Sequence, residues 1–269
     1  MKHFVSLFFL CFIAFCVHAQ VARTVEVVAP GSLCNHFTQQ EQFTVTKLIL
    51  TGNIDVRDFK FMKDSMPFLS DVDLSESHIM AYSGPYGTSM YASEYAANEI
   101  PDYGFAASNE LGYLKKIKLP ATLTGIGEHA FAFCTGLDTI HLSEKVVSLD
   151  WMSFGGSSAV LSIDPENAVF CDVDGMLLDK SKHLFIYCPT SHTGPLVLPE
   201  TVDSIAGNAF CECQRLESVE LPKSVRYIGY DAFYYCTGLK TLIVNNTPDK
   251  IKLEEEAFYG VHIRLFHYS

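Results

Sequence analysis

The sequence has few long apolar runs, which limits the number of segments that could span a membrane. Its one such run is at the N-terminus, from Phe4 to Val17, and it follows a lysine. This run is shorter than the about 20 residues that a spanning helix needs, and small residues follow it. We therefore predict a signal peptide over residues 1–19, cleaved before Gln20. Cys16 leaves a lipoprotein as an alternative, and no later stretch is apolar enough to span a membrane.

Positive charge is scarce as well. The chain has 19 Lys and Arg against 31 Asp and Glu, a formal net charge of −12. A chain of this sign repels the phosphate backbone, so we expect no nucleic-acid partner. Common catalytic signatures are missing too, among them H-E-x-x-H, G-x-S-x-G, the P-loop and the dinucleotide fingerprint. The sequence therefore predicts no catalytic residue, no cofactor and no metal site.

Cysteine is too sparse to build the fold. Seven cysteines follow residue 19, and their spacing matches no dense disulfide scaffold. Their odd number leaves at least one free thiol unless two chains are bridged. A bond between Cys171 and Cys188 stays open, because geometry decides it and sequence does not. Apolar residues make up 48% of the chain, so packing must supply most of its stability.

The sequence contains an internal repeat. The segment "LKKIKLPATLTGIGEHAFAFCTG" from Leu114 is echoed by "LESVELPKSVRYIGYDAFYYCTG" from Leu216, and each unit is 23 residues long. Weaker copies begin at Leu137 and Leu239, and a partial copy begins at Leu196. Self-similarity at a fixed period of this length is typical of solenoids.

Each unit begins as a short strand and then turns. The alternating apolar residues of L-x-x-I-x-L indicate a strand that is buried on one side. A proline has no N–H for the ladder and ends three of these strands, at Pro120, Pro199 and Pro222. An Ile-Gly turn and an Ala-Phe pair follow, and the Phe recurs at Phe131, Phe154, Phe210, Phe233 and Phe258.

One unit is too small to bury its own apolar face, so the copies must stack. We predict a mixed β/α repeat fold, a right-handed leucine-rich-repeat solenoid of short parallel strands with Phe in the wall opposite the strands. Three cysteines, Cys134, Cys213 and Cys236, each lie three residues after a repeat Phe. We interpret them as a buried ladder of small hydrophobes rather than as metal ligands.

Residues 20–110 follow the same architecture more loosely, as a cap and divergent leucine-rich coils. Leu48 and Val72 take equivalent strand positions, and the pattern predicts a helix from Asp58 to Met66 between them. A second helix, from Ser32 to Gln42 with Ser32 as N-cap, is expected to cover the first edge of the stack. The Tyr-rich stretch 82–98 is predicted to be a loop.

Residues 111–269 hold the regular repeats, with one interruption at 163–193. Its segment "DVDGMLLDKSKHLFIYCP" predicts two strands joined by a polar turn near Asp179 to Lys182, a hairpin inserted into one coil. Asp172 to Gly175 faintly matches a calcium loop. Because His183 stands where such a loop needs a bidentate Glu, we predict a simple turn there.

The repeat "LP-x-x-L/V-x-x-I-G-x-x-A-F-x-x-C-x-x-L" resembles the BspA-type leucine-rich repeat, a family of surface and secreted proteins of anaerobic host-associated bacteria. "GNIDVRDFKFMKDSMP" and "DGMLLDKSKHLFIYCP" are similar to segments of such proteins as well. The second repeat departs from the pattern at "DWMSFGG", and the last lacks the proline after its strand. The resemblance implies adhesion or recognition, with no catalytic residues to carry over.

The expected binding surface is the concave face of the strand layer. In each strand the residues that flank the central apolar one should point outward. They form a mixed polar stripe, Asp71, Asp73, Lys116, Lys118, Thr139, His141, Ser218, Glu220 and Thr241, which continues at Ile243. A solvated face without a ligand is the alternative. The tyrosines of the Tyr-rich loop are a second candidate surface, with a flexible spacer as their alternative: Tyr82, Tyr86, Tyr91 and Tyr95.

These patterns predict a non-enzymatic extracellular module that binds a host or bacterial surface protein or glycan. Export would leave it secreted, periplasmic or associated with the cell surface. One alternative is a secreted carbohydrate-active hydrolase whose site lies in the Tyr-rich loop or the hairpin. The other is a structural subunit of the cell surface.

Overall fold

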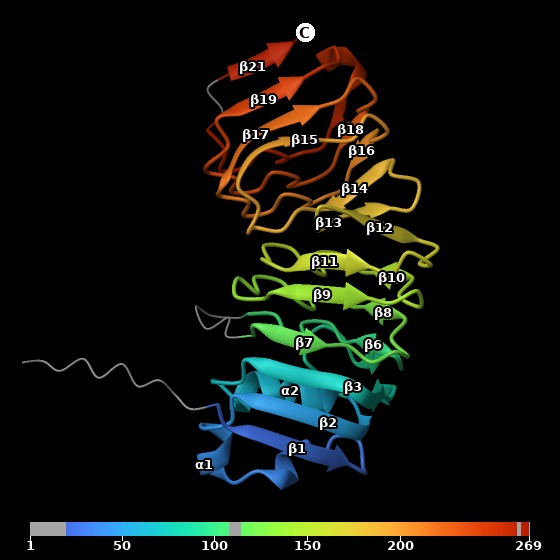
Figure 1. Cartoon of the computed structure of the whole chain (residues 1–269), viewed down its shortest axis with the longest axis vertical. Helices are drawn as coiled ribbons and strands as arrows, with labels where there is room; N and C mark the ends of the chain where they lie inside the picture. Colours follow the sequence, from blue (N-terminus) through green and yellow to red (C-terminus); the bar gives the residue numbers. More distant parts are fainter. Residues whose placement is uncertain (1–19, 108–113, 263–264, 269) are drawn as a thin grey trace, which may run out of the picture.

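The computed structural model describes residues 20–107, 114–262 and 265–268. The chain forms a β-solenoid of about nine turns of parallel strands with little helix, so the predicted fold class is confirmed. Figure 1 shows the strands stacked from β1 to β21 along the long axis of the molecule. The predicted signal peptide, residues 1–19, lies outside the described residues.

One wall of the solenoid, the strand layer, carries the L-x-x-I-x-L segments. Its first sheet has the order β1 (Ala22–Val27), β2 (Lys47–Ile54), β3 (Asp71–Ile79) and β7 (Lys116–Lys118), all parallel. Next come the parallel pair β9 (Thr139–Leu142) and β11 (Val160–Ile163), and then β15 (Gly194–Val197), β17 (Leu216–Leu221), β19 (Thr241–Val244) and β21 (Leu265–Tyr268). Leu48 pairs with Val72 and Val72 with Ile117, which confirms the predicted alignment of the divergent coils with the regular ones.

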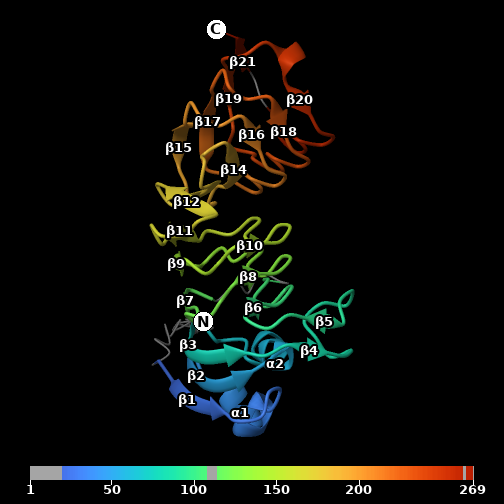
Figure 2. The same ribbon diagram turned by 90° about the vertical axis from the view of Figure 1, so that its right-hand side faces the viewer.

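Except for β14, the second wall is built from two-residue strands, which lie at the Ile-Gly turns and at the equivalent positions of the other coils. It begins with β6 (Glu99–Ile100), β8 (Gly125–Ile126) and β10 (Ser148–Leu149), and continues through β14 (Leu184–Tyr187), β16 (Ser204–Ile205), β18 (Tyr227–Ile228) and β20 (Lys252–Leu253). The short 3-10 helix η2 (Pro248–Lys250) precedes β20. Figure 2 shows this wall beside the strand layer.

The repeat phenylalanines stack into two separate columns. In the first, Phe131 lies 5.6 Å from Phe105 and 5.4 Å from Phe154, ring centre to ring centre. In the second, the centres of Phe185, Phe210, Phe233 and Phe258 follow one another at 4.8, 4.6 and 4.9 Å. The buried residues divide into two apolar clusters at the same place, so the solenoid has two cores in series.

The break between the columns is the predicted interruption. The chain there forms three antiparallel strands, β12 (Phe170–Val173), β13 (Met176–Asp179) and β14, where the sequence predicts two. The first turn is tight, because Asp174 and Gly175 both adopt positive φ, of 52° and 80°. Asp172 to Gly175 is therefore a turn, as predicted, and it joins a further strand, β12, to β13. The predicted hairpin turn near Asp179 to Lys182 joins β13 to β14, which returns the chain to the second wall.

The N-terminal cap differs from the predicted helix over Ser32 to Gln42. It is split into a 3-10 helix, η1 (Leu33–His36), and one turn, α1 (Gln39–Gln42). Phe37 between them is extended and buried, and its ring packs 5.9 Å from that of Phe61. Thr38 then starts α1 with a capping box to Glu41, whereas Ser32 makes no side-chain cap.

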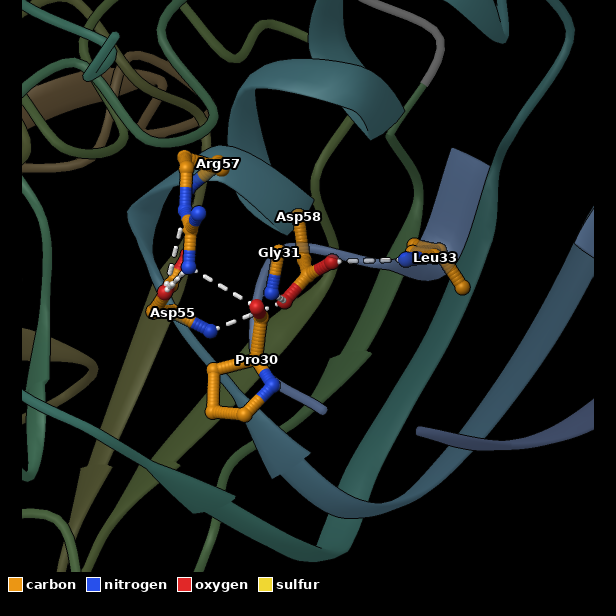
Figure 3. A network of polar contacts seen from close by, with 6 residues as sticks. All are labelled: Pro30, Gly31, Leu33, Asp55, Arg57 and Asp58. Atoms are coloured by element: carbon orange, nitrogen blue, oxygen red, sulfur yellow. Dashed lines mark hydrogen bonds and ion pairs between the residues drawn. The ribbon is translucent and has the colours of Figure 1, made fainter. Parts of the chain in front are cut away.

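Helix α2 (Val56–Ser65) begins two residues before the predicted start and carries the polar network of Figure 3. The buried carboxylate of Asp58 accepts backbone N–H bonds from Gly31, Leu33 and Asp55 at 2.8–2.9 Å. Arg57 pairs with Asp55 and donates to the carbonyl of Pro30 at 2.8 Å. This network holds residues 30–33 to the start of α2 and so ties the cap to the stack.

The Tyr-rich stretch is more ordered than a plain loop. Strands β4 (Tyr82–Ser83) and β5 (Glu94–Tyr95) pair antiparallel, and Tyr95 is buried. Its hydroxyl accepts from the Ser89 N–H at 3.2 Å and donates to the Ala92 carbonyl at 3.1 Å. Tyr86 and Tyr91 remain exposed. Tyr95 therefore organises the segment rather than offering a contact surface.

Candidate binding groove

A groove of about 800 Å³ runs along the N-terminal ends of the strands in the first half of the strand layer. Its lining includes the first residues of five neighbouring strands, Lys47, Asp71, Lys116, Thr139 and Val160. The segment Thr135 to Asp138 and the side chain of Ser191 complete it. The strands all begin at the same edge of the strand layer, so the repeat brings residues far apart in sequence into one row along that edge.

The row carries alternating charge. Lys47 lies in register with Asp71, and its Nζ is 3.0 Å from the Asp71 carboxylate. Asp71 in turn lies in register with Lys116. Lys116 forms no ion pair with any residue that the structure describes, and it is exposed. The groove therefore offers the ammonium group of Lys116, unpaired among the described residues, beside the Lys47–Asp71 ion pair.

The adjacent row is less open than the sequence suggested. Asp73 is only 8% exposed, because Lys118 covers it with an ion pair of 2.7 Å. Burial raises the pKa of Asp73, but the hydrogen bonds from Lys118 and Ser75 outweigh it and leave the pKa below the ordinary value. Asp73 is thus a partner that positions Lys118, not a free contact as predicted. Lys118 itself is exposed and lines the groove.

The predicted stripe divides into two places. Asp71, Lys116, Lys118 and Thr139 line the groove, and His141 is exposed one row further along the same layer. The members from β17 and β19 lie beyond the three-stranded break, half-buried: Ser218, Glu220, Thr241 and Ile243. The strand layer therefore does not present them as one continuous surface.

Sequence reasoning missed several groove residues, among them the charged residues Lys47 and Asp138. Lys47 belongs to the divergent coils, but it stands one residue before Leu48, as Asp71 stands before Val72, and this spacing could have identified it. Asp138 lies within the L-x-x-I-x-L segment that begins at Leu137, but it precedes β9 and does not flank the central Ile140, so the outward-pointing pattern did not include it.

The cysteines form the expected ladder. Cys134, Cys213 and Cys236 are buried, and Cys188 joins them three residues after Phe185. Burial raises the pKa of Cys134 to about 12. Cys188 packs against Cys213. The Cys171 thiol donates to the Asp179 carbonyl at 3.2 Å, and Cys171 and Cys188 form no disulfide with each other. The ladder is a packing feature of inert thiols.

Within the described ranges, no group of three His, Cys, Asp or Glu side chains is arranged to hold a metal ion. The helices in the same part of the chain are all too short or too polar to cross a bilayer. The chemistry available at the groove is that of ion pairs and hydrogen bonds.

Known proteins match this architecture. Six copies of the sequence model described as "BspA type Leucine rich repeat region" cover residues 97–170 and 181–266. The fold is similar to a leucine-rich repeat protein from Eubacterium ventriosum, with a TM-score of 0.56 and 14% identity over 85% of this chain and 61% of that one. No curated protein sequence matches the chain.

A second solved structure, the pneumococcal vaccine antigen PcpA, has a TM-score of 0.51 and 20% identity over 78% of this chain and 58% of its own. At these identities the likeness concerns the fold alone. The chain spans about three fifths of the length of both structures.

Proposed function

The chain belongs to the BspA-type leucine-rich repeat family, and we propose that it is an exported, non-enzymatic binding module that holds a surface protein or glycan in the groove of its strand layer. Repeat proteins of this kind present extended surfaces built from one row of residues per coil. A host or bacterial surface is the expected source of the partner.

The observation that carries the proposal is the exposed charge of Lys116 and Lys118 in a groove of about 800 Å³. The chain as a whole is acidic, so a groove lined by Lys47, Lys116 and Lys118 is a local exception. Asp73 holds Lys118 through their ion pair, and Asp71 lies in register with Lys116. A partner with carboxylate, sulfate or dense hydroxyl groups would complement such a surface.

The test is retention of the chain on arrays of host and bacterial glycans and surface proteins. We expect Lys116→Glu with Lys118→Gln to weaken retention by about tenfold or more, about 1.4 kcal/mol. Glutamine is chosen at 118 because a glutamate there would face the buried Asp73 carboxylate. Lys145→Glu on an exposed turn, the same substitution as Lys116→Glu, is the matched control.

Circular dichroism must be the same in both variants and in the unaltered chain. Retention that survives the groove substitutions, or that Lys145→Glu reduces equally, would remove the groove from the proposal.

A further inference from the structure

A second cleft lies on the opposite wall, at the break between the two phenylalanine columns. It has a volume of about 220 Å³. Trp151 and Met152 line one side, Gly207 and Asn208 the other, and the buried side chains of Leu177 and Tyr187 lie at its base. None of these residues belongs to the groove of the strand layer.

The cleft follows from an interruption of the repeat geometry. In every regular coil the residues two before and two after the repeat Phe adopt positive φ, and these bends form a continuous corner. The pairs are His129 and Phe133, Met152 and Gly156, Asn208 and Glu212, Asp231 and Tyr235, and Glu256 and Gly260. His183 and Tyr187 flank Phe185 in the same way, but neither adopts a positive φ, because strand β14 continues through Phe185 without a bend. One bend of the corner is therefore missing, and the space it would fill stays open.

A buried polar group faces this space without a partner. Asn208 is only 6% exposed, it lines the cleft, and its Nδ2 is buried with no hydrogen-bond acceptor. A buried donor left unsatisfied costs about 1–3 kcal/mol. Native proteins usually complete such a group with a bound molecule or an ordered water. His129 and Asp231, at the same repeat position in other coils, also hold a buried atom without a partner, but of the three only Asn208 lines the cleft.

The other side of the cleft is aromatic. Trp151 is 52% exposed at the rim, and the edge-to-face contact of His129 at 4.8 Å holds its ring from behind. The row continues through Tyr103, which stacks on His129 at 4.8 Å. Gly207, at the repeat position of Trp151 in the coil beyond the break, lines the cleft and has no side chain to fill it.

We propose that this cleft binds one neutral pyranose ring, as a monosaccharide or as the end of a glycan. The apolar C–H face of the sugar would lie against Trp151, and a ring or hydroxyl oxygen would accept from Asn208 Nδ2. The volume is below the about 300–1,000 Å³ of pockets for drug-sized ligands, which limits the occupant to a single ring. Asp150, which also lines the cleft, can accept a sugar hydroxyl and repels anionic ligands.

This site is independent of the proposed groove and of its partner, since the two lie on different walls of the solenoid. Loss of binding at one leaves the other intact, so the two proposals fail separately.

The chain contains a single tryptophan, Trp151, so a ligand that binds the folded chain at this cleft should change its fluorescence. We would titrate the purified chain with the methyl pyranosides of glucose, galactose, mannose and N-acetylglucosamine, up to about 50 mM. At least one should change the Trp151 emission saturably. Ligand-observed saturation-transfer NMR should give the same ranking of sugars.

The decisive variant is Asn208→Gly, which keeps the positive φ of this position and removes the amide. It should weaken binding by about tenfold or more. Asn208→Asp, which also tolerates positive φ, should do the same. The matched control is Asp231→Gly, the equivalent position one coil further on and outside the cleft, which should bind normally.

Three results would overturn the proposal: no response to any of the four sugars, binding that Asn208→Gly leaves unchanged, or a crystal soaked in sugar that shows only an ordered water on Nδ2. If Asn208→Gly fails to fold, as judged by circular dichroism, Asn208→Asp and the soaked crystal decide the question.

Discussion

Removing one ring from the second phenylalanine column should unfold one half of the solenoid before the other. Phe233 is fully buried between Phe210 and Phe258, with ring centres at 4.6 and 4.9 Å. Phe233→Ala should cost about 3–5 kcal/mol as a core truncation. The upper part of that range applies, because two stacked contacts worth about 0.5–1.5 kcal/mol each are lost together.

The cost should fall on the C-terminal core alone. The two apolar clusters are separate, and in a solenoid each coil depends mainly on its neighbours. Trp151 belongs to the coil of Phe154, in the first cluster's part of the chain, so its fluorescence follows the N-terminal half, whereas far-UV circular dichroism follows both. In urea, Phe233→Ala should therefore give an early dichroism transition while the Trp151 midpoint stays near that of the unaltered chain.

Phe131→Ala is the matched variant in the first column and should lower the Trp151 midpoint. Lys116→Ala, at an exposed position, should change the unfolding free energy from either probe by no more than about 0.5 kcal/mol. If Phe233→Ala shifted both probes equally, the two cores would be one cooperative unit and the reasoning would be wrong. A cost at Lys116 equal to that at Phe233 would refute the assignment of the walls.

Three further substitutions test other parts of the structure. Glu212 has a φ of +60°, and Gly156 and Gly260 occupy the same repeat position, so Glu212→Gly should raise the unfolding free energy by about 0.5–1 kcal/mol, whereas Glu217→Gly in strand β17 should lower it. The pKa of Glu99 is raised by burial and by the neighbouring Asp150 and Asp102, so its charge costs stability once the pH exceeds its ordinary range. Glu99→Gln should therefore raise the Tm at pH 7 and leave it unchanged at pH 3, where the carboxyl is protonated in both states; a gain at both pH values would contradict this. Asp58→Ala leaves three backbone N–H groups without their acceptor and should cost about 2 kcal/mol or more in thermal unfolding, while Lys60→Ala on the exposed face of the same helix should cost little.

The proposed groove and cleft differ in how far sequence could locate them. Lys116 and Lys118 follow from strand alternation alone, because alternate residues of a strand point to opposite sides. The burial of Asp73 does not follow, since it depends on Lys118 reaching across from a strand 45 residues away. The cleft at Trp151 could not be predicted from the sequence, because it arises where strand β14 replaces a bend of the backbone.

The sequence by itself determined the repeat, its strand and turn positions, and the stacking of Phe131, Phe154, Phe210, Phe233 and Phe258 in the wall opposite the strands. It could do so because period and alternation are local properties, and a unit with one apolar face has no stable arrangement except a stack. Only the tertiary structure decided that the column breaks in two, that the cap helix splits at Phe37, and that Cys188 joins the ladder. Each of these depends on which side chains meet across coils, and that is set by the packing of segments distant in the chain.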